Sequence, residues 1–158
     1  PTPPGDLFRA IRESVAPAFD SRPVAVRVEP DCPDAFVDPS LALEIFVNLV
    51  ENAHRASPPG APIELVARRH PIDAKQIRFE VIDEGPGIAG LPLADPPNGV
   101  APIEAGDLPR RGLGLEIARS LATASGGSMS IGNRQSGRGT VARVDLPAAP
   151  LPGEEPAT

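Results

Sequence analysis

The chain has 158 residues, of which 41% are apolar, so it can bury one sizeable core, whereas two domains would be crowded. Its formal net charge of −6 and its lack of Trp and Tyr argue against a nucleic-acid surface, which would need basic patches and stacking rings. The single cysteine, Cys32, excludes an intramolecular disulfide and favours a reducing compartment, and no zinc-ligand spacing accompanies it.

The N-terminal region predicts a disordered linker, one helix and two short strands. The linker is residues 1–5, the helix is residues 6–19, and the strands are residues 24–28 and 35–37. A second helix follows, because the Asp-Pro-Ser of residues 38–40 is a start signal and the Pro-Pro-Gly of residues 58–60 is a stop signal.

The second helix divides into an apolar and a polar arc at about 100° per residue. The apolar arc contains Ala42, Ile45, Phe46, Leu49, Val50, Ala53 and Ala56, and the polar arc contains Glu44, Asn48, Glu51, Asn52 and Arg55. The amide oxygens of Asn48 and Asn52 can ligate a hard cation such as Mg²⁺, which proteins usually share with substrate phosphates. Two solvated amides on an exposed face are the alternative interpretation.

Two strands are predicted next, at residues 63–68 and 76–82. The second has apolar residues at every other position and ends just before Asp83. Gly85 and Gly87 then permit backbone geometry that side chains would forbid, and they let the chain approach a flat ligand. A buried carboxylate at this strand end could accept a hydrogen bond from an exocyclic amine such as that of adenine. The alternative is a plain turn with two glycines.

A third helix is predicted from Gly112 onward, and Gly126 with Gly127 ends it. Backbone N–H groups and the helix dipole attract phosphate at such a glycine-containing start, although the sequence has neither a P-loop nor a dinucleotide fingerprint. An amphipathic helix with a flexible start is the alternative. Strands at residues 128–131 and 140–146 are expected to complete the sheet, and residues 148–158 to be a disordered tail.

Together these clusters resemble the nucleotide-binding domain of sensor histidine kinases, in the superfamily shared with gyrase, the heat-shock chaperone ATPase and MutL-type mismatch-repair proteins. The N, G1 and G2 boxes and the closing signature correspond to residues 48–53, 83–88, 112–115 and 137–140. Less specifically, residues 51–63 and 132–134 resemble potassium-sensing kinases. Four motifs in the family's order make chance agreement improbable.

The resemblance implies a single ATP-binding domain at residues 6–147. Its fold would be an α/β two-layer sandwich, in which three helices cover one face of a mixed, mostly antiparallel β-sheet. ATP and Mg²⁺ would lie between the helices and a lid at about residues 89–111. Five prolines with scattered glycine predict an irregular lid.

The resemblance also implies a role for each matched residue. Asn52 would hold Mg²⁺, Asn48 would support the phosphates or the ion, and Arg55 would lie near the phosphates. Asp83 would bind the adenine amine, and Thr140 would complete the hydrogen bonds around the base. Further nucleotide contacts would come from Gly85, Gly87 and Ile88, and from the main-chain amides of Gly112, Leu113, Gly114 and Leu115. Arg110 and Arg111 could reach the terminal phosphates as transition-state cations; a solvated basic pair is the alternative.

One departure from the superfamily bears on the reaction. Members that hydrolyse ATP place a glutamate four residues before the magnesium asparagine, where this chain has Asn48. An amide cannot take a proton from water, so we expect phosphoryl transfer to a protein histidine with little ATPase activity. His54 and His70 lack the pattern of an acceptor. The acceptor is therefore expected on a dimerisation and histidine phosphotransfer domain outside this chain, in a homodimeric parent that signals to a response regulator.

No apolar run is long enough for a transmembrane segment or a signal peptide. We expect a cytoplasmic domain without membrane contact, and any membrane anchor of the parent would lie outside this sequence. Many sensor kinases carry a Phe-centred motif in the lid, which this chain lacks. That difference keeps a binding-only module, such as a pseudokinase or scaffold, as an alternative. A serine kinase of the anti-sigma-factor type would use the same pocket on another acceptor.

Overall fold

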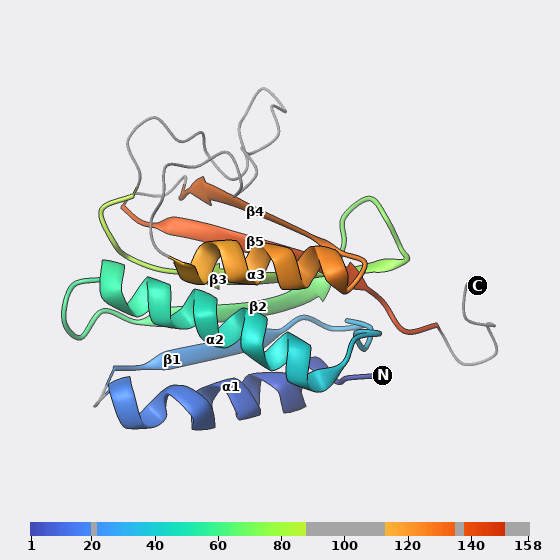
Figure 1. Ribbon diagram of the computed structural model, residues 1–158, viewed down its shortest axis with the longest axis horizontal. Helices are drawn as coiled ribbons and strands as arrows, with labels where there is room; N and C mark the ends of the chain where they lie inside the picture. Colours follow the sequence, from blue (N-terminus) through green and yellow to red (C-terminus); the bar gives the residue numbers. More distant parts are fainter. Residues whose placement is uncertain (20–21, 88–112, 135–137, 151–158) are drawn as a thin grey trace.

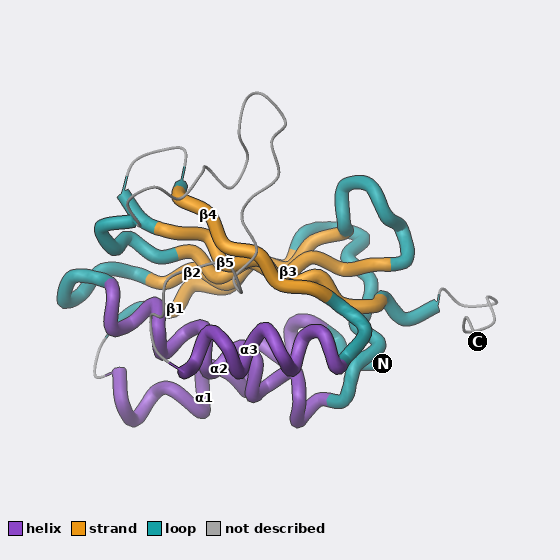
Figure 2. Tube along the Cα trace, turned by 45° about the horizontal axis from the view of Figure 1, so that its top comes forward, coloured by secondary structure: helices purple, strands orange, loops and turns teal. Residues whose placement is uncertain are grey.

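The computed structural model describes residues 1–19, 22–87, 113–134 and 138–150 of the chain. Within them, three helices cover one face of a five-stranded sheet (Figure 1; Figure 2). The elements are α1 (Pro4–Phe19), β1 (Val24–Val28), α2 (Pro39–Ala56), β2 (Ile63–Arg69), β3 (Gln76–Ile82), α3 (Leu113–Ala124), β4 (Ser128–Asn133) and β5 (Thr140–Pro147). This two-layer α/β sandwich confirms the predicted fold class.

The sheet has the strand order β1-β2-β3-β5-β4. Strand β1 runs parallel to β2, and all the other neighbouring pairs are antiparallel. The last residue of β3, Ile82, pairs with Val141 near the start of β5. This register places Asp83, which follows β3, beside Thr140, although the two residues are 57 positions apart.

Helix α2 begins and ends as its sequence predicts. Asp38 is the N-cap, and its carboxylate accepts a hydrogen bond of 2.8 Å from the backbone N–H of Ser40. The predicted apolar arc is buried except for Ala56, which is half-buried at the end of the helix. Below the sheet, the ring of Phe79 packs against Phe46 and Phe8, with centroids 4.9 and 6.0 Å apart. Among the described helices, none combines the length and apolar character needed to cross a bilayer.

The sheet face opposite the helices carries cross-strand ion pairs. Glu80 on β3 accepts a hydrogen bond of 2.8 Å from Arg143 Nε on β5, and both side chains are buried. Arg68 Nε lies 3.0 Å from the other Glu80 oxygen as an ion pair, without the angle of a hydrogen bond. A second cross-strand pair joins Arg78 on β3 to Asp145 on β5, where Arg78 donates two hydrogen bonds to the carboxylate. Period-2 alternation thus separates an apolar face from a charged one.

The N-terminal linker was predicted wrongly. Residues 1–5 are not disordered, because Thr2 exchanges backbone hydrogen bonds of 2.7 and 2.9 Å with Ala35 and is only 6% exposed. Helix α1 also starts at Pro4, two residues earlier than expected, since a proline suits the first turn of a helix. The predicted strand at residues 35–37 is reduced to bridges that Ala35 makes with Thr2 and with Ala148.

The start of the predicted tail is also ordered, because Ala148 bridges Ala35 and the Ala149 N–H donates to the Asp34 carbonyl over 2.8 Å. Residues 151–158 lie outside the described part.

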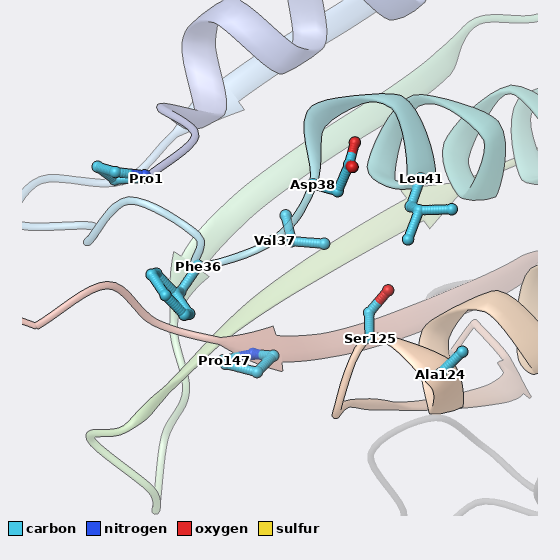
Figure 3. A pocket seen from close by; sticks show the side chains of 8 residues that line it. All are labelled: Pro1, Phe36, Val37, Asp38, Leu41, Ala124, Ser125 and Pro147. Atoms are coloured by element: carbon cyan, nitrogen blue, oxygen red, sulfur yellow. The ribbon is translucent and has the colours of Figure 1, made fainter. Parts of the chain in front are cut away.

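A hollow of about 370 Å³ lies between the start of α2 and the end of α3 (Figure 3). It is lined by Pro1, Phe36, Val37, Asp38, Leu41, Ala124, Ser125 and Pro147. Since Pro147 pairs with Gln76 at the start of β3, this hollow is at the opposite end of the sheet from Asp83.

Candidate functional site

Asp83 is the most firmly held polar side chain at the end of β3, where it is 4% exposed. Its Oδ1 atom accepts hydrogen bonds from the backbone N–H groups of Gly85 and Thr140, over 2.9 and 3.2 Å. Its Oδ2 atom accepts from the Thr140 hydroxyl over 2.5 Å. A carboxylate offers about four acceptor positions, so three protein donors leave room for one more on Oδ2. The sequence-predicted pair of Asp83 and Thr140 is therefore brought together, with acceptor capacity to spare.

Gly85 and Gly87, which follow Asp83, each lie close to a different neighbour, and this contact disfavours a side chain at the position. A Cβ atom on Gly85 would lie 2.8 Å from the Ala56 carbonyl oxygen at the end of α2. Gly87 has a φ of +77°, and a Cβ atom there would lie 3.0 Å from Asn133 Oδ1. Both positions are thus too close to neighbouring residues to carry a side chain without a shift, and the predicted approach of this segment to a flat ligand stays a prediction. Ile88, the next residue of the predicted set, lies outside the described residues.

Asn48, Arg55 and Gly114 meet where α2 faces the start of α3. The Asn48 Nδ2 group donates a hydrogen bond of 2.9 Å to the Glu44 carbonyl, one turn back on α2. With the amide so oriented, Asn48 Oδ1 lies 3.6 Å from where a Cβ atom on Gly114 would be, and Arg55 Nη2 lies 3.9 Å from the same point. A glycine at position 114 therefore keeps open a small space bordered by an amide oxygen and a guanidinium.

Asn52 lies between Asn48 and Arg55 on the same polar stripe of α2 and is half-buried. Its side chain forms no hydrogen bond with another residue in the described ranges. Within those ranges, no group of three or more His, Cys, Asp or Glu side chains could hold a metal ion. A hard cation on this stripe would therefore need further oxygens, such as those of the amides and of its ligand.

The start of α3 is described from Leu113 onward, so three predicted residues, Arg110, Arg111 and Gly112, lie outside the described part. Leu115 is buried in the core beneath the sheet. Its side chain is therefore part of the hydrophobic core, and only its main-chain N–H could contact a ligand. That the G2 residues contact phosphates through main-chain amides at the helix start stays a prediction.

Neither histidine is placed as a free nucleophile in the structure. His70 Nδ1 accepts hydrogen bonds of 3.2 and 2.9 Å from the backbone N–H groups of Ile72 and Asp73, so it closes the turn between β2 and β3. His54 is part of α2 and is half-buried.

Burial, with a smaller contribution from Glu29, raises the pKa of Cys32 to about 11, so its thiol is neutral at pH 7.

Two residues beside Asp83 were not assigned to the site from the sequence. Gly139 has a φ of +124°, and a Cβ atom there would lie 2.0 Å from the Asp83 carbonyl oxygen. Arg134 Nη1 donates a hydrogen bond of 3.3 Å to that same oxygen. The Gly-Arg-Gly-Thr run of residues 137–140 marked the region of Gly139, and the weaker resemblance of residues 132–134 included Arg134. Neither signal indicated the bond between Arg134 and Asp83, because the two residues are 51 positions apart.

The fold and this arrangement define a class of nucleotide-binding protein. Residues 37–150 match the family described as "Histidine kinase-, DNA gyrase B-, and HSP90-like ATPase", and the chain belongs to this family. The match contains α2, the Asp83 turn, α3 and the last two strands. Membership implies that the domain uses a nucleotide.

Within this family, the similar proteins are sensor kinases. The chain is 30% identical over 143 residues to the sensor protein KdpD of Clostridium acetobutylicum, which covers 82% of this chain but only 14% of that protein. It superimposes on the mycobacterial sensor histidine kinase MprB with a TM-score of 0.68 and 23% identity, covering 93% of this chain and 95% of that one. Full-length ShkA in complex with AMPPNP gives a TM-score of 0.67 and 26% identity over 92% of this chain and 31% of that one. The chain thus has the fold of a histidine kinase catalytic domain and spans a small part of its KdpD relative.

Proposed function

We propose that this chain is the catalytic domain of a two-component sensor histidine kinase, which binds Mg²⁺-ATP and transfers the γ-phosphoryl group to a histidine on a separate domain. The observation that carries this proposal is the buried Asp83 carboxylate, oriented by Gly85 and Thr140 with one acceptor position to spare. An exocyclic amine of adenine is a donor of the right kind for that position.

The phosphates would lie on the polar stripe of α2 opposite the start of α3. Arg55 supplies the positive charge, and its guanidinium already borders the space beside Gly114. The main-chain amides of residues 112–115 would complete the contacts, with Gly85, Gly87 and Ile88 lining the base. Arg110 and Arg111 precede the helix in the sequence and would add charge to the terminal phosphates.

The residues on α2 suit Mg²⁺. Asn52 has a half-buried amide that is uncommitted among the described residues, and the neighbouring Asn48 turns its oxygen, not its nitrogen, toward Gly114. Asn52 would hold the ion and Asn48 would support it or the phosphates. When bound, Mg²⁺ would offset the phosphate charge that builds up during transfer.

The chain's own residues favour transfer over hydrolysis. Asn48 occupies the position from which a base would act on water, and its Nδ2 is already bonded to the helix. An amide does not accept a proton at neutral pH, so water near the γ-phosphate would not be activated. In the transfer, the bond between the γ-phosphorus and the bridging oxygen of ADP breaks, a phosphorus–nitrogen bond forms, and the imidazole loses its N–H proton to solvent.

The acceptor would be on a dimerisation and histidine phosphotransfer domain of the same homodimeric protein, with a response regulator downstream and a cytoplasmic location. Two features support an acceptor elsewhere: His70 is committed to the β2–β3 turn, and the sensor kinase relative KdpD is far longer than the segment matched here.

The test is to incubate the chain with a separately produced histidine-bearing dimerisation domain and γ-labelled ATP, and then to treat the phosphoprotein with acid. We expect Mg²⁺-dependent label that acid removes, because phosphohistidine is acid-labile. Label that survives acid would instead identify a serine kinase. ATP binding without any label on several such domains would identify a non-transferring module, and no ATP binding at all would refute the proposal.

A further inference from the structure

The turn between β4 and β5 contributes the Arg134 side chain to the Asp83 region, a contact that none of the four motifs indicated. Arg134 is the first residue after β4, and its N–H donates a hydrogen bond of 3.0 Å to the Gly139 carbonyl. This bond joins the two ends of the turn next to Asp83. The Arg134 side chain is half-buried, so its position is set by packing and not by solvent.

Gly139 makes the contact between Arg134 and Asp83 possible. A Cβ atom at position 139 would lie 2.8 Å from Arg134 Cδ and 2.0 Å from the Asp83 carbonyl oxygen. Without a side chain there, the Arg134 stem lies across Gly139 and its Nη1 atom reaches the Asp83 carbonyl over 3.3 Å. The three residues therefore form one contact unit from two distant parts of the chain.

Asp83 is thereby held in two independent ways. Its carboxylate is held by Gly85 and Thr140, whereas its main chain is held by the Thr140 carbonyl, over 3.1 Å, and by Arg134. The Asp83 carbonyl belongs to the peptide plane between Asp83 and Glu84, and the Gly85 N–H belongs to the next plane along the chain. Rotation of the first plane would shift Glu84, and with it the Gly85 N–H that donates to Oδ1.

We propose that Arg134 is a positioning residue for recognition of the purine amine, acting through the main chain of Asp83; this rests on the function proposed above. Arg134 holds the peptide plane between Asp83 and Glu84, this plane sets the position of Glu84 and the following Gly85 N–H, and that N–H helps to aim the carboxylate at the ligand's exocyclic amine. A charged donor is a strong partner for a carbonyl, so its loss has a measurable effect.

The experiment compares ATP with purine riboside 5′-triphosphate, which lacks only the amine at position 6, by calorimetric titration of the chain with Mg²⁺. We expect Arg134→Ala to weaken ATP binding about tenfold and to change binding of the analogue by less than about twofold. The preference for ATP over the analogue would then largely disappear. Arg134→Lys keeps a long cationic donor and should restore most of the preference.

Arg138→Ala is the matched control, because this exposed arginine belongs to the same turn and its removal costs the same charge. It should leave the preference unchanged. Equal weakening of both nucleotides by Arg134→Ala, or no weakening of either, would overturn the proposal. If Arg134→Ala does not fold, Arg134→Gln takes its place, because its methylene groups still cover Gly139. The affinity for ATP relative to that for the analogue is then compared in the same way. Wild-type protein that shows no preference for ATP would instead refute the proposed adenine site itself.

Discussion

The two ends of the candidate nucleotide site differ in how much of their geometry exists before a ligand arrives. At the base end, Asp83 accepts three hydrogen bonds from its own protein and is almost fully buried. At the phosphate end, Asn52 has no hydrogen bond with another described residue, and Arg55 is exposed. The first end is preorganised, and the second is composed of side chains whose partners would come with the ligand.

This difference has a physical reason. Burying a carboxylate is costly unless protein donors replace its water, so Asp83 must be satisfied for the domain to fold. Amides and a guanidinium on a helix surface stay hydrated at little cost and can be uncommitted. Substitutions at the base end should therefore affect stability and affinity together, whereas removal of a polar side chain at the phosphate end should affect affinity alone.

The largest stability effect should come from Gly139→Ala. The new Cβ atom would overlap the Asp83 carbonyl oxygen and the backbone would be held at a φ of +124°, so we expect a loss of about 2 to 4 kcal/mol in the free energy of unfolding. Urea denaturation measures this. Gly60→Ala is the control, because Gly60 also has a positive φ but open space around it, and it should cost about 1 kcal/mol. Equal losses would show that the contact with Asp83 is unimportant.

Asp83→Asn should have the largest effect on affinity. The amide keeps the shape and one acceptor oxygen. Its NH₂ group, however, would face either the backbone N–H groups of Gly85 and Thr140, in place of Oδ1, or the Thr140 hydroxyl and the purine amine, in place of Oδ2. We expect ATP binding to weaken about 30- to 100-fold and stability to fall by about 1 to 2 kcal/mol. Calorimetry and denaturation measure the two quantities. Asp73→Asn, in the distant β2–β3 turn, should alter neither by much. Wild-type affinity in Asp83→Asn would contradict the base end as described.

Asn52→Ala should weaken ATP binding about tenfold when Mg²⁺ is present and not at all when it is chelated. Since no described residue depends on this side chain, stability should change by less than about 0.5 kcal/mol. Titrations with and without EDTA make the measurement, with Glu44→Gln on the same stripe as the control. A loss of affinity that persists in EDTA would assign Asn52 a role other than holding the ion.

Gly114→Ala should make the domain slightly more stable, unlike the other substitutions. Its Cβ atom would make ordinary contacts, and alanine favours a helix over glycine, so the free energy of unfolding should rise by up to about 1 kcal/mol. The methyl group would nevertheless enter the space between Asn48 and Arg55, and we expect ATP to bind more weakly while adenosine is unaffected. Weaker binding of adenosine as well would mean that this space does not belong to the phosphates alone.

Local patterns in the sequence predicted the elements of the site well. The apolar arc of α2 marked its buried side, the caps marked its ends, and alternation in β3 placed Asp83 at a strand end. These features depend on neighbours within a few residues, which is the range over which periodicity and capping act. The family resemblance then supplied Thr140 as a second residue near the base, and the structure shows that it donates hydrogen bonds to Asp83.

Long-range contacts could not be predicted in this way. The bond from Arg134 to Asp83 depends on β5 pairing with β3, and nothing in the sequence near either residue indicates that strand order. The same is true of Thr2 and Ala35, since a single bridging pair has no periodicity to recognise. Residues 1–5 were therefore expected to be disordered although they are tied to the core.

The most direct measurement is a crystal structure of the chain with Mg²⁺ and a non-hydrolysable ATP analogue. The account predicts the purine amine within hydrogen-bonding distance of Asp83 Oδ2, the ion on Asn52, and the phosphates between Arg55 and the start of α3. A nucleotide bound elsewhere, such as in the hollow between Phe36 and Ser125, with Asp83 untouched, would contradict it.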